Sequence, residues 1–182
     1  MSQRNSTKKQ IVNLSVSAML CALGVIILSL GSLVEVVDAS VAVIASLLCV
    51  YAVIEIGGIY PWLIWLVTSI IGLLLLVSQP TPVLFYALLA GYYPILKAKF
   101  ERLPVALSYL LKWACATIGT LAIGGVSYLF VPSLLEGLHA PWLLALTYLG
   151  ILAVFFLYDV CLTMLITFYF RRLRKRLRLH KD

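Results

Sequence analysis

Two charged residues stand inside apolar stretches in the second half of the chain, Lys112 and Asp159. Lys112 follows Arg102 by about ten residues, and Asp159 precedes Arg171 by about twelve, so in helices both would lie roughly 15 to 18 Å above the same membrane face. A lone charge in hydrocarbon costs at least about 2.5 to 3.5 kcal/mol. The sequence therefore predicts that the ammonium group of Lys112 pairs with the carboxylate of Asp159.

This pair could serve structure or chemistry. A structural ion pair would clamp the helices that carry the two residues. Titratable groups at membrane depth would instead suit a small proton-coupled transporter, as part of a substrate site or as coupling residues. The apolar spans do not divide into two halves with matching motifs, as the inverted repeats of many transporters do. Both interpretations stay open.

Motifs for catalysis, metal binding or phosphate binding are not found in the sequence. It contains neither GxSxG nor HExxH, and its two histidines are isolated. The four cysteines fall in apolar runs without CxxC spacing, and we interpret them as small packing residues. We therefore expect no enzyme activity, no metal and no cofactor.

The composition excludes a soluble globular domain. Apolar residues make up 63% of the 182 residues, only 12% are charged, and the mean hydropathy is +1.08. We expect an all-α, polytopic membrane protein that forms one six-helix bundle. Its approximate spans are 11–33, 39–56, 61–77, 83–96, 103–131 and 142–170.

Basic residues orient these spans. Arg4, Lys8 and Lys9 precede the first span, which predicts a cytoplasmic N-terminus in the plasma membrane. The fourth run is short and contains Gly91 and Pro94. It is interpreted as a crossing because three basic residues that fit a return to the cytoplasm follow it, namely Lys97, Lys99 and Arg102.

The basic tail, residues 171–182, holds half of the chain's 14 basic residues. A basic cluster directly after an apolar helix is typical of the membrane surface, whereas the aromatic or glycine-rich modules of RNA-binding proteins do not accompany it. We expect a cytoplasmic C-terminus and contact with anionic lipid headgroups. The residues concerned are Arg171, Arg172, Arg174, Lys175, Arg176 and Arg178.

The first span has one face made of small residues. Ala18 and Ala22 are four apart, with Ser17, Cys21 and Gly24 beside them, so another helix can approach closely. That helix could belong to the protein's own bundle or to a separate membrane subunit.

This layout resembles the S components, the substrate-binding subunits of energy-coupling factor (ECF) transporters. Their first helix bears an AxxxA-type motif that docks a membrane coupling subunit, and Ala18-Met19-Leu20-Cys21-Ala22 matches it. The resemblance implies that the chain binds a micronutrient from the external side and depends on coupling and ATPase subunits for transport. The positions that would fall in the external pocket are Glu35, Asp38, Gln79, Tyr86, Tyr128, Glu136, His139 and Trp142.

The competing hypothesis is a membrane protein that transports nothing. An accessory or assembly subunit could use the same helix face and the basic tail to hold a partner. Direct binding of a small solute would separate the two hypotheses.

Overall fold

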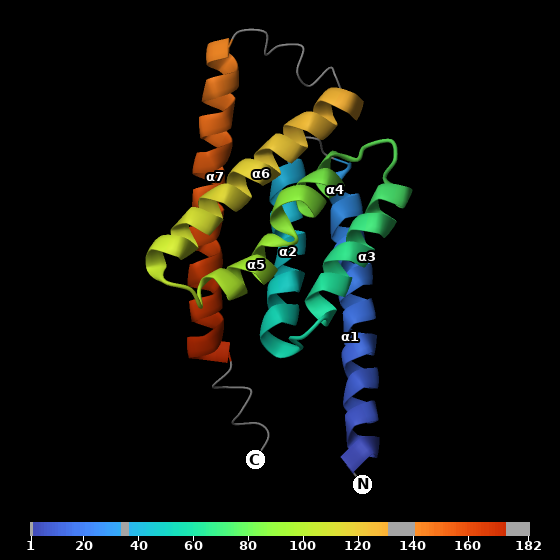
Figure 1. Ribbon diagram of the computed structural model, residues 1–182. Coiled ribbons are helices and arrows are strands. Elements are labelled where there is room, and N and C mark those ends of the chain that lie inside the picture. The colour runs from blue at the N-terminus through green and yellow to red at the C-terminus, as the bar shows by residue number, and fades with distance from the viewer. Residues whose placement is uncertain (1, 34–36, 131–140, 174–182) are drawn as a thin grey trace. The chain divides into compact units, whose positions relative to one another are not determined.

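The computed structural model describes residues 2–33, 37–130 and 141–173, and within these ranges every regular element is a helix (Figure 1). The all-α prediction is confirmed for this part of the chain. Contacts divide the chain into a first unit, Met1–Val126, and a second unit, Ser127–Asp182. Each unit is described below by itself.

The first unit is built on three helices, α1 (Ser2–Gly31), α2 (Asp38–Glu55) and α3 (Tyr60–Leu75). Helix α1 packs along both α2 and α3. Small residues permit this approach, because a methyl group added at Gly31 would lie 2.8 Å from Val41 of α2. One added at Gly24 would lie 3.0 Å from Thr68 of α3. The glycine positions on α1 thus fix how closely the three helices approach one another.

A broken helical segment, Thr81–Phe100, packs against α2. It comprises α4 (Thr81–Phe85), a π turn called η2 (Tyr86–Ala90) and α5 (Tyr93–Phe100), with an interruption at Gly91 and Tyr92. Pro94 lacks a backbone N–H and so cannot continue the preceding helix. The expected fourth span, 83–96, is therefore not one continuous helix.

Two long helices complete the described chain. Helix α6 (Val105–Phe130) begins directly after Pro104, in agreement with the expected fifth span. Helix α7 (Pro141–Phe168) continues into a second π turn, η4 (Tyr169–Leu173). Within the described residues, the second unit consists of the end of α6, helix α7 and η4.

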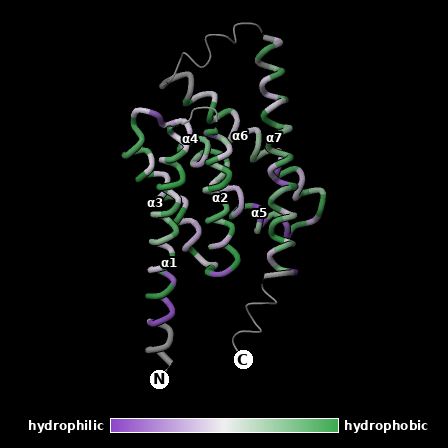
Figure 2. The backbone as a smooth tube through the Cα atoms, turned by 180° about the vertical axis from the view of Figure 1, so that it is seen from behind, coloured by the Kyte–Doolittle hydropathy of each residue, from purple (hydrophilic) through white to green (hydrophobic). Residues whose placement is uncertain are grey.

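Among the described residues, four helical stretches are long and apolar enough to cross a membrane: Thr7–Gly31, Asp38–Glu55, Val105–Val126 and Ala145–Arg171. Apolar residues occupy most of the length of these four stretches (Figure 2). Large apolar side chains on them are exposed, such as Leu110 at 65% and Met164 at 68%, as lipid-facing residues would be. Helix α3 has 16 residues, so its length is about 24 Å. These features fit a membrane protein.

Candidate functional site

The interior of the first unit contains a polar centre made of four side chains from four elements: Cys21 of α1, Cys49 of α2, Thr68 of α3 and Tyr86 of η2. The hydroxyl of Tyr86 lies 3.2 Å from the sulfur of Cys49. The Thr68 hydroxyl lies beside the Cys21 thiol and the Tyr86 hydroxyl, although not in the geometry of an ordinary hydrogen bond. Cys49, Thr68 and Tyr86 are at most 1% exposed. The polar centre therefore links all four elements, and of its members only Cys21, at 8% exposed, reaches the surface.

An apolar groove of about 680 Å³ lies between α1 and α3 and opens onto the surface of the first unit. Ala18 and Ala22 both line it and both are exposed. Cys21 lines it as well, so this residue belongs to the groove and to the polar centre. The remaining lining residues are Leu14, Ser17, Val25, Ile26, Leu63, Ile64, Val67 and Ile71.

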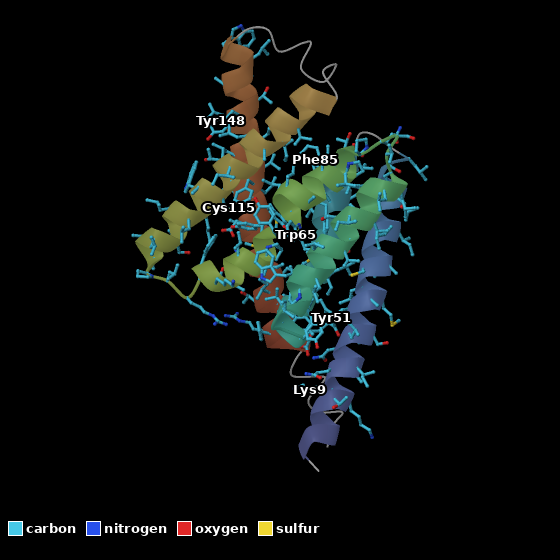
Figure 3. The ribbon with its side chains drawn as sticks, turned by 45° about the vertical axis from the view of Figure 1, so that its right-hand side comes forward. Lys9, Tyr51, Trp65, Phe85, Cys115 and Tyr148 are labelled. Atoms are coloured by element: carbon cyan, nitrogen blue, oxygen red, sulfur yellow. The ribbon has the colours of Figure 1, made fainter. Side chains whose placement is uncertain are left out.

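The broken segment lies against aromatic side chains. The indole nitrogen of Trp65 donates a hydrogen bond to the carbonyl oxygen of Ala87, at 3.1 Å. The Trp65 ring also meets the ring of Tyr92 edge-on, with centroids 6.1 Å apart. From α6, the thiol of Cys115 contacts the hydroxyl of Tyr92 at 3.7 Å. Trp65 and Cys115 thus approach the interruption in the helix from α3 and α6 (Figure 3).

Lys97 of α5 is a buried charge that the sequence interpretation missed. Its side chain is 1% exposed and forms a salt bridge with Glu101 at 3.4 Å, whereas Glu101 is 44% exposed. From the sequence, Lys97 was interpreted only as one of three basic residues that fit a return to the cytoplasm, and that pattern does not predict its burial. The position of Lys97 relative to Tyr93 could have indicated its burial. Tyr93 lies four residues earlier, on the same face of α5, and is fully buried.

No family model, curated protein or solved structure matches this chain. What the chain does has to be inferred from its own residues. Among the described residues, no three His, Cys, Asp or Glu side chains come together as a group that could hold a metal ion. The groove and the polar centre are the features from which a function can be argued.

Three of the predicted substrate residues have described side chains in the first unit. Asp38 begins α2, where a carboxylate interacts favourably with the helix dipole, and it is partly exposed. Gln79 is exposed in the connection between α3 and α4. Both positions lie at the end of this unit opposite the start of α1 (Figure 1). Tyr86 is instead enclosed in the polar centre, so the structure does not bring it together with Asp38 and Gln79 at the surface.

The other predicted substrate residues are distributed as follows. Trp142, at the start of α7 in the second unit, is 66% exposed. Glu35, Glu136 and His139 lie outside the described residues, and so does the side chain of Tyr128. In the basic tail, Arg171 is described and exposed. Outside the described part lie the side chain of Arg172 and the residues Arg174, Lys175, Arg176 and Arg178.

The predicted ion pair joins residues of different units. Lys112 lies on α6 in the first unit, partly exposed, with its ammonium nitrogen 5.8 Å from the centre of the Tyr109 ring. Asp159 lies on α7 in the second unit and is 9% exposed. Its backbone carbonyl accepts a hydrogen bond from the Thr163 hydroxyl at 2.9 Å. The pairing of Lys112 with Asp159 stays a prediction.

Proposed function

We propose that this chain is the substrate-binding membrane subunit of an ECF-type micronutrient uptake transporter. The observation that carries the proposal is the apolar groove between α1 and α3, which has Ala18 and Ala22 in its lining. These two residues form the AxxxA motif that, with the expected span count and the basic termini, supports the resemblance to S components. In this proposal the groove receives a helix of a membrane coupling subunit.

The chemistry of the groove suits a helix from a partner subunit. Lipid and leucine side chains are similarly apolar, so helices associate in a membrane mainly through close packing. Ala18 and Ala22 lie on one face, four residues apart, and leave room for a second backbone to approach. Ser17 also lines the groove, and its hydroxyl is already bonded to the Asn13 carbonyl at 2.7 Å. The partner can therefore bury this face without leaving the Ser17 donor unpaired.

The proposed topology has six crossings with both termini in the cytoplasm of a plasma-membrane protein. The four long apolar helices supply four of them, and α3 and the broken segment supply the other two. An interrupted helix is tolerated at membrane depth where protein covers its backbone. Tyr86, Ala90 and Tyr93 are at most 3% exposed, so the broken segment is covered in this way. In this topology the basic tail contacts anionic headgroups at the cytoplasmic face.

The substrate would bind at the external end. Because basic residues precede the first span, the opposite end of the first unit, where Asp38 and Gln79 lie, would face outward. Together with Glu35, Tyr128, Glu136, His139 and Trp142, these residues remain the proposed substrate set. Tyr86 would act from within the polar centre, beneath this set.

Co-purification and uptake test the proposal. A tagged chain solubilised in mild detergent should bring down a membrane coupling subunit and ATPase subunits. Ala18→Leu with Ala22→Leu should abolish both co-purification and uptake. The matched control is Ala106→Leu with Ala114→Leu, because these two alanines are also exposed but lie on α6, outside the groove. If the groove variant keeps full uptake, the proposal is wrong.

The same groove would serve an accessory or assembly protein that holds a membrane partner without transporting anything. Thermal melts of the purified chain against a panel of vitamins and metabolites separate the two functions. A raised melting temperature with one solute favours the transporter subunit. No shift with any solute, together with one co-purifying protein that is not an ATPase complex, favours the accessory protein.

A further inference from the structure

Tyr86 takes part in two structures at once. Its hydroxyl belongs to the polar centre, where it meets Cys49 at 3.2 Å. Its carbonyl oxygen accepts a hydrogen bond from the backbone N–H of Gly91 at 2.7 Å, the five-residue step of a π turn. Any displacement of the Tyr86 side chain therefore acts on the backbone of the broken segment.

The polar centre also reaches the groove. Cys21 lines the groove and is only 8% exposed, and its thiol lies beside Thr68. Thr68 lies beside Tyr86 in turn. The methyl carbon of Thr68 lies 3.0 Å from where a Cβ atom on Gly24 would be, so Thr68 packs against α1 in the space that this glycine leaves. A side chain that presses into the groove meets Cys21 first, and Thr68 and Tyr86 lie beyond it toward the π turn.

The π turn can change only in a discrete step. It holds one residue more per hydrogen-bonded turn than an α-helix does, so conversion to α geometry shifts the helical register by one residue, which is about 100° of rotation. Gly91, at the end of the π turn, is closely surrounded. A Cβ atom on Gly91 would lie 2.6 Å from a ring carbon of Trp65 and 2.8 Å from the Tyr86 carbonyl oxygen. The element directly after the π turn and this interruption is α5, with the buried Lys97.

We propose that occupation of the groove between α1 and α3 is relayed through Cys21, Thr68 and Tyr86 to the π turn, which shifts register and turns α5. The identity of the occupant, a partner helix, rests on the proposed function, whereas the relay is a property of this chain alone. Docking on one face would in this way change the broken segment on the other side of α3.

The relay can be tested without any partner or substrate. The full chain is labelled with 5-fluorotryptophan in lipid nanodiscs, and the fluorine resonance of Trp65 is assigned by its loss in Trp65→Phe. Ala18→Phe fills the groove, and Ala114→Phe, an equal change at an exposed site on α6, is the control. Trp65 suits the measurement because it bonds to the π turn and does not line the groove.

We expect Ala18→Phe to displace or double the Trp65 resonance and Ala114→Phe to leave it in place. Thr68→Ala and, separately, Cys21→Ala remove side-chain atoms from the relay and leave a gap in it, so adding Ala18→Phe to either should cause no further displacement. An unmoved resonance in Ala18→Phe, or an equal displacement in both relay variants, would overturn the relay. Failure of the partner to co-purify would instead count against the proposed function and leave this result unchanged.

Discussion

The indole N–H of Trp65 donates a hydrogen bond to the Ala87 carbonyl oxygen, 3.1 Å away, and so joins α3 to the π turn of the broken segment. A π turn leaves backbone groups without their α-helical partners, and a buried carbonyl without a donor is costly. The bond explains how an irregular backbone can lie inside an apolar bundle. Replacement of Trp65 should therefore destabilise this segment directly.

Trp65→Phe should lower the free energy of unfolding by about 1 to 3 kcal/mol, because the Ala87 carbonyl loses its indole donor. Titration with SDS in mixed micelles measures the change. Trp62→Phe is the control, since Trp62 meets Trp65 edge-on with centroids 5.8 Å apart. Losses of equal size in the two variants would show that ring packing, and not the hydrogen bond, stabilises the segment.

Gly91→Ala should destabilise the protein by about 1 to 3 kcal/mol, as overpacking in a closed site does. The new methyl group would lie 2.8 Å from the Tyr86 carbonyl oxygen, a backbone atom that cannot turn aside. Gly124→Ala on α6 is the control, because nothing lies within 4 Å of its added Cβ. That control should be neutral or stabilising by up to about 1 kcal/mol, from helix propensity alone. Thermal melts of the two variants in the same detergent compare them, and a Gly91→Ala protein as stable as Gly124→Ala would refute the close packing.

Glu101→Gln should destabilise the first unit more than Lys97→Met does. Removing the carboxylate deprives a buried ammonium group of an ion-pair partner, whereas removing the ammonium leaves a half-exposed carboxylate that water can solvate. Lys99→Met, at an exposed neighbour whose ammonium lies 5.6 Å from the Trp62 ring centre, controls for loss of positive charge. In unfolding titrations of the three variants, Glu101→Gln should have the lowest free energy of unfolding. The burial of Lys97 would be contradicted by a Lys97→Met protein less stable than Glu101→Gln.

Lys112→Met alone should be more destabilising than Lys112→Met combined with Asp159→Leu, because the single change leaves a buried carboxylate without its predicted partner. A double-mutant cycle of unfolding free energies measures the coupling. If the double variant loses as much stability as Lys112→Met alone, or more, Lys112 and Asp159 do not form an ion pair.

The sequence predicted the long helices well and the interior poorly. The expected spans 39–56 and 142–170 agree within two residues with α2 (Asp38–Glu55) and α7 (Pro141–Phe168). Carboxylates bound the first apolar run at both ends, whereas the second run begins at a proline and ends before Arg171. The broken segment could be suspected from Gly91 and Pro94. Its π turn could not be predicted from the sequence, since the turn depends on contacts with other helices, such as the hydrogen bond from Trp65 of α3.

The polar centre shows why the candidate site was only partly predicted. Cys21 and Cys49 were interpreted as packing residues and Tyr86 as a ligand-binding residue, whereas the structure joins all three in one buried cluster. Neutral polar side chains inside apolar runs carry no periodic signal, and only the packing of α1, α2 and η2 brings them together. The small-residue face with Ala18 and Ala22 could be predicted, because a spacing of four residues places both side chains on one side of a helix.

Photo-crosslinking from the groove in native membranes tests the proposed docking of a coupling subunit most directly. With benzoylphenylalanine at position 22 in place of Ala22, we expect a discrete adduct that contains a membrane subunit which co-purifies with ATPase subunits. The same probe in place of Ala114 should not form this adduct. Adducts with lipid alone from position 22, in cells that take up the substrate, would show that no coupling subunit docks in the groove.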